Sequence, residues 1–222
     1  FLINAIHDID DLNYTTGMKV TRVYAAARNT IRGNEVEDSA SIVIEFDNGV
    51  TATYFISDGT PGPWNYDLAA EENHFFQWCP GENSLRFFGT QGSFGFPNMD
   101  FYHYVDDDHY GWAEKLVTEH FDVEKNDPMT AEIEHFADLC LGRETAPRCT
   151  GEDGVATLKV INAILESAET GKLVEMIKTL SFTSIQQEKA PFGEPFPAVY
   201  RHDTKKQITT IAFRSIYMFT EP

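Results

Sequence analysis

Basic residues and long apolar runs are scarce in this chain of 222 residues. Only 17 lysines and arginines stand against 35 aspartates and glutamates, and the resulting net charge of −18 repels nucleic-acid phosphates and anionic membrane surfaces. No apolar run reaches the 18 residues of a transmembrane helix, and the first residues lack the basic segment of a signal peptide. We therefore expect neither a nucleic-acid partner nor a membrane partner.

Cysteine is also rare, and two common enzyme motifs are missing. The three cysteines, Cys79, Cys140 and Cys149, are far apart and form no Cys-x-x-Cys pair, which predicts no disulfide framework, no structural zinc and a cytoplasmic location. No Gly-x-Gly-x-x-Gly turn and no Gly-x-Ser-x-Gly elbow occurs. The chain alone is thus not expected to bind a dinucleotide or to act as a serine hydrolase.

What the sequence does contain begins with an amphipathic helix. Asn4, His7 and Asp11 are spaced so that they share one helical face. An imidazole titrates near neutral pH, and a carboxylate one turn away can orient it and raise its basicity. The pattern suggests a proton-transfer group, although a histidine near a helix start is more often structural. Because the chain starts without Met and inside an apolar segment, we expect a fragment or a processed piece.

Alternating residues after this helix predict antiparallel strands. A strand is expected at 20–24, and the alternation over 40–47 and 50–55 predicts a hairpin in which Asn48-Gly49 forms a two-residue type I′ turn. A second hairpin is expected over 85–96, followed by a strand at 101–104.

The period changes to a helical one after Pro128. Met129, Ile133, Phe136 and Cys140 predict an amphipathic helix that ends near Gly142. A second helix is expected from Thr150, its N-cap, to Gly171. Its expected buried stripe consists of Val155, Leu158, Ile161, Leu165 and Ala168.

Strands followed by helices indicate an α+β fold with a mainly antiparallel, open-faced sheet and helices packed on one face. We expect one domain over 1–175 and an extension over 176–222, which could add an edge strand at 207–213 or be poorly ordered.

Several further side chains are candidates for a binding pocket. Asp8 adjoins His7, Arg28 is expected at a strand end, and Trp64 stands in a Gly/Pro-rich loop that could line a pocket or only close the edge of the core. The segment 103–109 holds two histidines and three aspartates, but consecutive aspartates more often make a solvated turn than a metal site. We expect no metal.

Four segments together resemble the C-terminal half of the Gfo/Idh/MocA oxidoreductases, the family of glucose-fructose oxidoreductase and inositol dehydrogenase. They are Leu2 to Asp10, Ser57-Asp58 with Pro63-Trp64, Gly89-Thr90-Gln91-Gly92-Ser93, and Gly151 to Val174. The resemblance implies a preceding Rossmann domain that binds NAD or NADP and is missing here, and a sheet that mediates homo-oligomer contacts. It makes His7 the counterpart of the family's active-site histidine.

Two departures from the family accompany this resemblance. Ile3 stands where many members have an aspartate, and the Glu-Lys-Pro segment with the family's catalytic lysine is absent. Asn4, one residue further on, can hydrogen-bond a substrate but cannot act as a base.

The expected function is therefore the substrate-binding and oligomerisation part of an NAD(P)-dependent oxidoreductase acting on a hydroxyl or carbonyl of a sugar, polyol or similar small molecule. In it, His7 moves the hydroxyl proton and Asp11 orients His7, while Asn4, Asp8, Arg28 and Trp64 contact the substrate. Two alternatives remain open at this point: a non-catalytic assembly module, and a relative of the redox-neutral glycosidases that use a tightly held NAD.

Overall fold

A computed structural model describes residues 3–106 and 108–176. The elements are, in order, α1 (Ala5–Thr16), β1 (Val20–Arg28), β2 (Ser39–Phe46), β3 (Thr51–Ser57), α2 (Tyr66–Ala70), β4 (Leu85–Gly89), β5 (Gly92–Phe96), β6 (Asp100–Tyr104), β7 (Leu116–His120), α3 (Pro128–Cys140), α4 (Gly151–Thr170) and β8 (Val174–Glu175). The strand expected at 207–213 lies outside the described residues.

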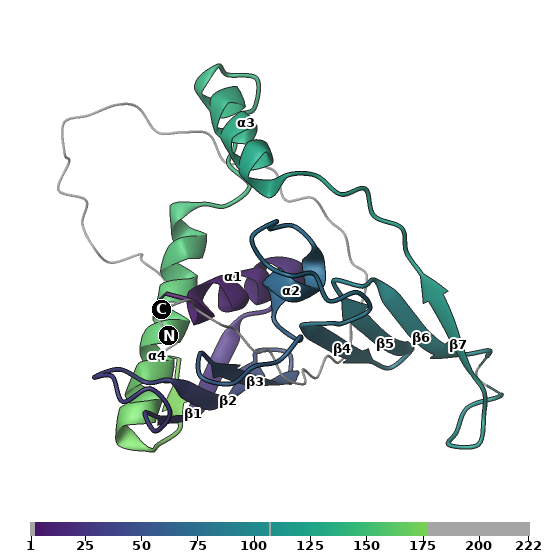
Figure 1. Cartoon of the computed structure of the whole chain (residues 1–222), viewed down its shortest axis with the longest axis horizontal. Coiled ribbons are helices and arrows are strands. Elements are labelled where there is room, and N and C mark those ends of the chain that lie inside the picture. The colour runs from purple at the N-terminus through teal and green to yellow at the C-terminus, as the bar shows by residue number, and fades with distance from the viewer. Residues whose placement is uncertain (1–2, 107, 177–222) are drawn as a thin grey trace.

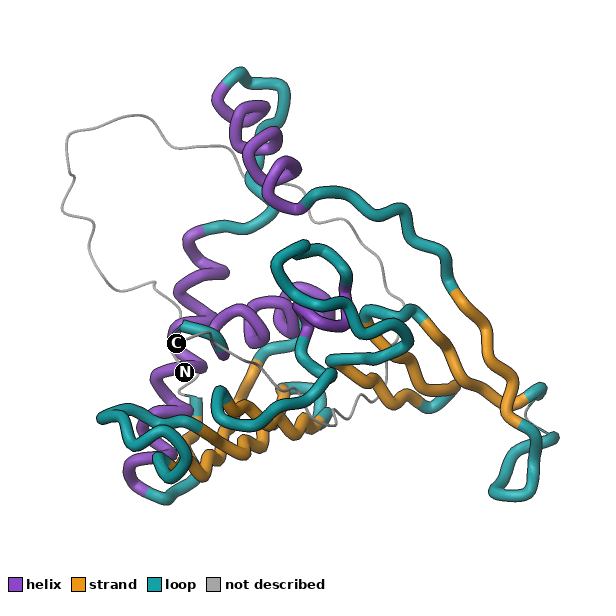
Figure 2. The backbone as a smooth tube through the Cα atoms, viewed as in Figure 1, coloured by secondary structure: helices purple, strands orange, loops and turns teal. Residues whose placement is uncertain are grey.

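The strands form two four-stranded sheets, with the orders β3-β2-β1-β8 and β4-β5-β6-β7 (Figure 1). Every strand pair is antiparallel. Helices α1 and α4 lie on one side of the first sheet (Figure 2). The α+β fold with antiparallel strands is confirmed, and the described part of the chain contains no Rossmann unit. None of its helices has the length and apolar character that crossing a membrane requires.

The core lies between α1, α4 and the first sheet, and strand alternation builds it. In β2, Ile42 and Ile44 are buried while Val43 between them is 41% exposed, because successive side chains point to opposite faces. Helix α1 adds Ile9 and α4 adds Ile161 to the same core. Burying each such side chain is worth about 1.5–3 kcal/mol relative to leaving it exposed. The first sheet thus has one buried and one open face.

The hairpin between β2 and β3 exists, but its turn is not of the expected type. Phe46 N donates to Val50 O at 2.9 Å, so the loop has three residues, Asp47 to Gly49. Only Gly49, with φ 84°, is left-handed, whereas a type I′ turn needs two such residues. The Asn48 side chain accepts from Val50 N at 3.1 Å, which stabilises this longer loop.

Helix α4 has the expected ends but a different buried face. Thr150 and Asp153 form a reciprocal capping box, and Gly171 is left-handed at the C-cap. Val155 and Leu158 are 52% and 42% exposed, so the expected stripe is wrong at these two positions. The buried residues are Thr157, Val160, Ile161, Ala163, Ile164 and Ser167.

Two hydroxyls explain why α4 buries a different face from the expected one. Thr157 Oγ1 donates to Asp10 of α1 at 2.8 Å. Ser167 Oγ accepts from Ala25 N of β1 at 2.8 Å and donates to Lys172 O at 2.6 Å. The polar residues therefore face inward because they tie α4 to its neighbours.

Helix α3 is present as expected, yet its apolar face is uncovered. Asp127 caps it by accepting from Met129 N, and Pro128 follows at the first helical position. Met129, Ile133 and Phe136 are each about two thirds exposed, and no residue of α3 is buried. In Figure 1 the helix stands apart from both sheets.

Candidate active site

Helix α1 separates an apolar face from a polar one. Ala5, Ile9 and Leu12 are buried against the first sheet, while His7 and Asp11 are exposed on the other side. The helix begins after Asn4, whose carbonyl oxygen accepts from His7 N at 3.0 Å. It ends at Gly17, with φ 63°. His7 and Asp11 therefore share one face, as the spacing predicted.

The expected hydrogen bond between His7 and Asp11 is not formed with either ring nitrogen. The two side chains still influence one another electrostatically: His7 lowers the pKa of Asp11, which the partial desolvation of its carboxyl and the neighbouring Asp10 raise above the ordinary range. His7 also lowers the pKa of Asp67, which burial raises. The imidazole is thus within electrostatic range of carboxylates on two helices.

Asp67 reaches this site because of the Gly/Pro-rich loop that precedes α2. Asn65, which is buried, caps α2 by accepting from Leu68 N at 2.7 Å. Tyr66 stacks on Phe96 at a centroid distance of 5.8 Å and donates to Glu72 Oε1 at 2.8 Å. Burial, Glu72, Asp11 and Asp67 all raise the Tyr66 pKa, so this phenol and these acids belong to one electrostatic cluster.

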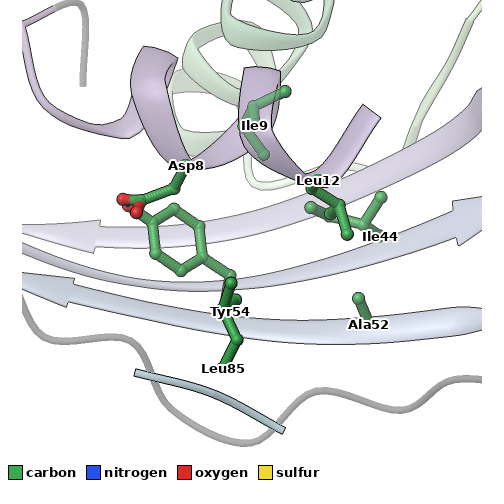
Figure 3. A pocket seen from close by; sticks show the side chains of 7 residues that line it. All are labelled: Asp8, Ile9, Leu12, Ile44, Ala52, Tyr54 and Leu85. Atoms are coloured by element: carbon green, nitrogen blue, oxygen red, sulfur yellow. The ribbon is translucent and has the colours of Figure 1, made fainter. Parts of the chain in front are cut away.

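Asp8 points from α1 toward Tyr54 of the sheet. Tyr54 of β3, only 4% exposed, donates its Oη proton to Asp8 Oδ2 at 2.6 Å (Figure 3). Burial raises the pKa of Asp8 to about 7, against the lowering effect of the Tyr54 hydrogen bond, while Asp11 and Asp67 raise it further. Burial likewise raises the Tyr54 pKa. Asp8 therefore exchanges its proton near neutral pH, a value suited to acid–base chemistry.

A small cavity adjoins this pair. Its volume of about 10 Å³ is room for about one water. It is lined by Asp8, Ile9, Leu12, Ile44, Ala52, Tyr54 and Leu85, as Figure 3 shows. This cavity is too small to hold a sugar.

The other predicted pocket residues have simple positions. Arg28 is exposed at the end of β1, and its Nη1 donates to the Ala27 carbonyl at 2.7 Å. Trp64 is 36% exposed, and its ring covers Gly62, where an added Cβ would lie 2.8 Å from the ring. Trp64 stands two residues before Tyr66 of the acidic cluster, whereas no contact of Arg28 links it to that cluster.

Sequence reasoning missed Tyr54, Tyr66, Asp67 and Glu72. A signal existed for Tyr54, because it is the one hydroxyl-bearing aromatic residue on the inward face of its strand. The other three come close to α1 only through the fold of the loop before α2.

The described residues of the segment 103–109 bring no metal site together. His109 Nδ1 contacts Asp106 Oδ1 at 2.7 Å, whereas His103 Nε2 faces Glu119 at 3.3 Å. Among residues 3–106 and 108–176, no group of three His, Cys, Asp or Glu side chains could hold a metal ion.

The described residues do not fit a dinucleotide. Their strands pair only antiparallel, so no strand–helix–parallel strand unit presents a helix N-terminus to a pyrophosphate. The carboxylates around His7 would also repel its phosphates.

An α+β domain of this kind, with antiparallel sheets and helices on one side, is the C-terminal part of a class of oxidoreductases. Residues 1–95 match the family model described as the GFO/IDH/MocA C-terminal domain, and the chain belongs to that family.

Three relatives illustrate the match. Over 160 residues the chain is 32% identical to D-xylose 1-dehydrogenase (NADP(+)) 2 of Haloferax volcanii, covering 70% of this chain and 41% of the relative. The fold is similar to a NAD-binding protein from Listeria innocua, with 19% identity, a TM-score of 0.57 and coverage of 78% and 50%. It is also similar to an aldose-aldose oxidoreductase from Caulobacter crescentus, crystallised with glycerol, with 20% identity, a TM-score of 0.52 and coverage of 77% and 45%. The chain thus spans half or less of each relative's length.

Proposed function

We propose that this chain is the substrate-binding and oligomerisation part of an NAD(P)-dependent oxidoreductase that acts on a hydroxyl or carbonyl of a sugar, polyol or similar small molecule. The observation that supports the proposal is that His7, on the exposed face of α1, is near enough to Asp11 of α1 and Asp67 of α2 to lower the pKa of both carboxyls. The name of the Haloferax volcanii relative, a D-xylose dehydrogenase, supports a sugar as substrate.

The chemistry divides between this chain and the cofactor. Oxidation of an alcohol by NAD(P) removes a hydride from carbon and a proton from oxygen. His7 is the group that takes this proton, and Asp11 stabilises the imidazolium that forms. Carboxylates such as Asp67 and Glu72 accept hydrogen bonds from the remaining hydroxyls.

Around this centre, the remaining predicted residues would hold the substrate. Asn4 precedes His7 on the same face, and Trp64 adjoins α2. The Asp8 carboxylate accepts the Tyr54 hydrogen bond. Asp8 would therefore exchange a proton close to the site and would not contact the substrate directly. Arg28, at the far end of β1, would contact only a larger substrate.

An assembly role is a second candidate, and two surfaces favour it. The open face of the first sheet exposes Tyr24 and Val43, each 41% exposed, and could pair two copies in a homo-oligomer. Helix α3 presents Ile133 and Phe136 without cover. If this chain were only an assembly module, sugar binding would not depend on His7 or Asp11.

The unpaired state of the three cysteines supports our proposal of a reducing, cytoplasmic location.

Calorimetric titration of the 222-residue protein with D-xylose and myo-inositol tests the proposal. We expect binding that weakens about five- to tenfold in His7→Gln and Asp11→Asn, because each change removes about one hydrogen bond or charge contact. Asp108→Asn, at an exposed site outside the cluster, is the matched control. Equal binding by all variants, or none by the wild type, would contradict the proposal.

A further inference from the structure

A second, larger cavity lies at the other sheet, around the β4–β5 turn and the end of β6. Its volume is about 430 Å³, within the range of small-molecule sites. It is lined by Phe88, Gly89, Thr90, Gln91, Gly92, Ser93, Phe101, Tyr102, His103, Tyr104, Asp106, Tyr110 and Leu116. None of these residues belongs to α1 or α2, so this cavity is separate from the candidate active site.

Aromatic rings form the walls of the cavity, and contacts among them fix their positions. Phe101 stacks on His103 with ring centroids 5.2 Å apart. Tyr104 meets Tyr110 edge to face at 4.8 Å. Such pairs contribute beyond the burial of their area, so the walls are in place before a ligand arrives.

Gly92 is required for this arrangement. A Cβ on Gly92 would lie 2.5 Å from Tyr102 O and 2.7 Å from the Phe101 ring. Only glycine therefore allows the Phe101 ring to close against β5 and form one wall.

The ionisable groups of the cavity, apart from its tyrosines, are the Asp106 carboxylate and the His103 imidazole, and the His103 Nε2 faces Glu119 at 3.3 Å. The β4–β5 turn supplies the hydroxyl of Thr90 and the amide of Gln91, and β5 supplies the hydroxyl of Ser93. Asp106 Oδ1 is used within its own loop, because it accepts from Asp108 N at 3.0 Å and from His109 N at 2.9 Å. No lysine or arginine is among the described residues that line the cavity.

The aromatic rings and polar groups that line the cavity together favour one class of ligand. An anion would find no lysine or arginine in the lining and would meet the Asp106 carboxylate. A flat apolar molecule would leave the polar turn unpaired, at a cost in desolvation. A sugar ring has an apolar CH face that packs on aromatic rings and an edge of hydroxyls that exchange hydrogen bonds with amides and hydroxyls.

We propose that this cavity, which we call the β4–β6 pocket, is a second binding site, and that its ligand is a neutral hydroxylated ring such as a free monosaccharide. Tyr104 packs on the ring face, and Gln91 bonds its hydroxyls. The site does not depend on His7 and does not require the proposed oxidoreductase function.

Saturation-transfer NMR on the 222-residue protein tests the pocket. The measurements use the His7→Gln protein as background, in which binding at the candidate active site is weakened, and D-xylose and D-glucose as probes; the Tyr104 variants then report on the pocket. We expect both sugars to bind this background. Adding Tyr104→Ala is expected to weaken binding about tenfold, whereas Tyr104→Phe keeps the ring and most of the affinity.

Gln91→Ala provides a second test that does not disturb packing, since Gln91 is exposed in a turn. We expect several-fold weaker binding with an unchanged melting temperature. D-glucose 6-phosphate should bind more weakly than D-glucose. The proposal is overturned if the His7→Gln protein binds no sugar, if Tyr104→Ala binds as well as Tyr104→Phe, or if the phosphorylated sugar binds more tightly.

One further outcome would also overturn it. If light scattering finds a dimer that Tyr104→Ala converts to a monomer, the pocket receives a side chain of a second copy and not a sugar.

Discussion

Replacing Asp8 with asparagine should stabilise the protein in a way that depends on pH. In the folded chain the pKa of Asp8 is about 7 instead of its ordinary 3.8, mainly because its carboxylate is buried. The carboxylate is therefore favoured far more in the unfolded chain than in the folded one. This difference corresponds to at most about 4 kcal/mol of unfolding free energy.

The direction follows from proton binding. Between about pH 4 and pH 7 the unfolded chain has released the Asp8 proton while the folded protein still holds it. The contribution of Asp8 to the free energy of unfolding is therefore complete at low pH, and it is lost as the pH rises to about 7. An asparagine at this position cannot ionise, and its amide oxygen can still accept the Tyr54 hydrogen bond (Figure 3).

Urea unfolding of both proteins between pH 4.5 and pH 8.5 measures the effect. We expect the free energy of unfolding of Asp8→Asn, minus that of the wild type, to grow with pH and to level off above about pH 7. Taking this difference cancels the groups common to both proteins. Asp108→Asn, at an exposed position, should show no such growth. A difference for Asp8→Asn that does not change with pH would refute the reasoning.

Three other substitutions test how the helices are held. Thr150→Ala removes one half of the α4 capping box and should lower the free energy of unfolding by about 1 kcal/mol, measured in urea. Gly17→Ala places a side chain at φ 63° and should cost about 1 kcal/mol in the same assay, although the space there is open; an unchanged stability would mean that α1 ends differently. Ser167→Ala leaves Ala25 N and Lys172 O without their partner and should cost about 1–3 kcal/mol, whereas Ser167→Thr, which keeps the hydroxyl, should cost less.

Local patterns in the sequence predicted much of the fold. The alternation over 40–47 and the Asn-Gly pair located the first hairpin, and Thr150 and Gly171 located the ends of α4. These features could be predicted because each depends on residues close together in the chain.

Features set by distant contacts could not be predicted in this way. The buried face of α4 is decided by Thr157 bonding Asp10, 147 positions earlier in the chain. The loop type after β2 depends on the Asn48 side chain bonding Val50 N and not on the Asn-Gly pair alone. Strand β7 has a weak pattern of its own and forms because it pairs with β6.

The candidate site shows the same division. The helical spacing placed His7 and Asp11 on one face, and this placement is confirmed. Asp67 and Tyr54 come from other elements, so only the folded chain shows that they surround α1. The catalytic and binding roles of His7, Asp11, Asn4, Asp8, Arg28 and Trp64 stay predictions.

The most direct test of the central claim is an NMR titration of the His7 imidazole signals with D-xylose, assigned by comparison with His7→Gln. We expect the His7 signals to shift with sugar concentration, while the His135 signals, on α3, stay constant. His7 signals that do not respond to any sugar or polyol would contradict the claim that this face of α1 binds the substrate.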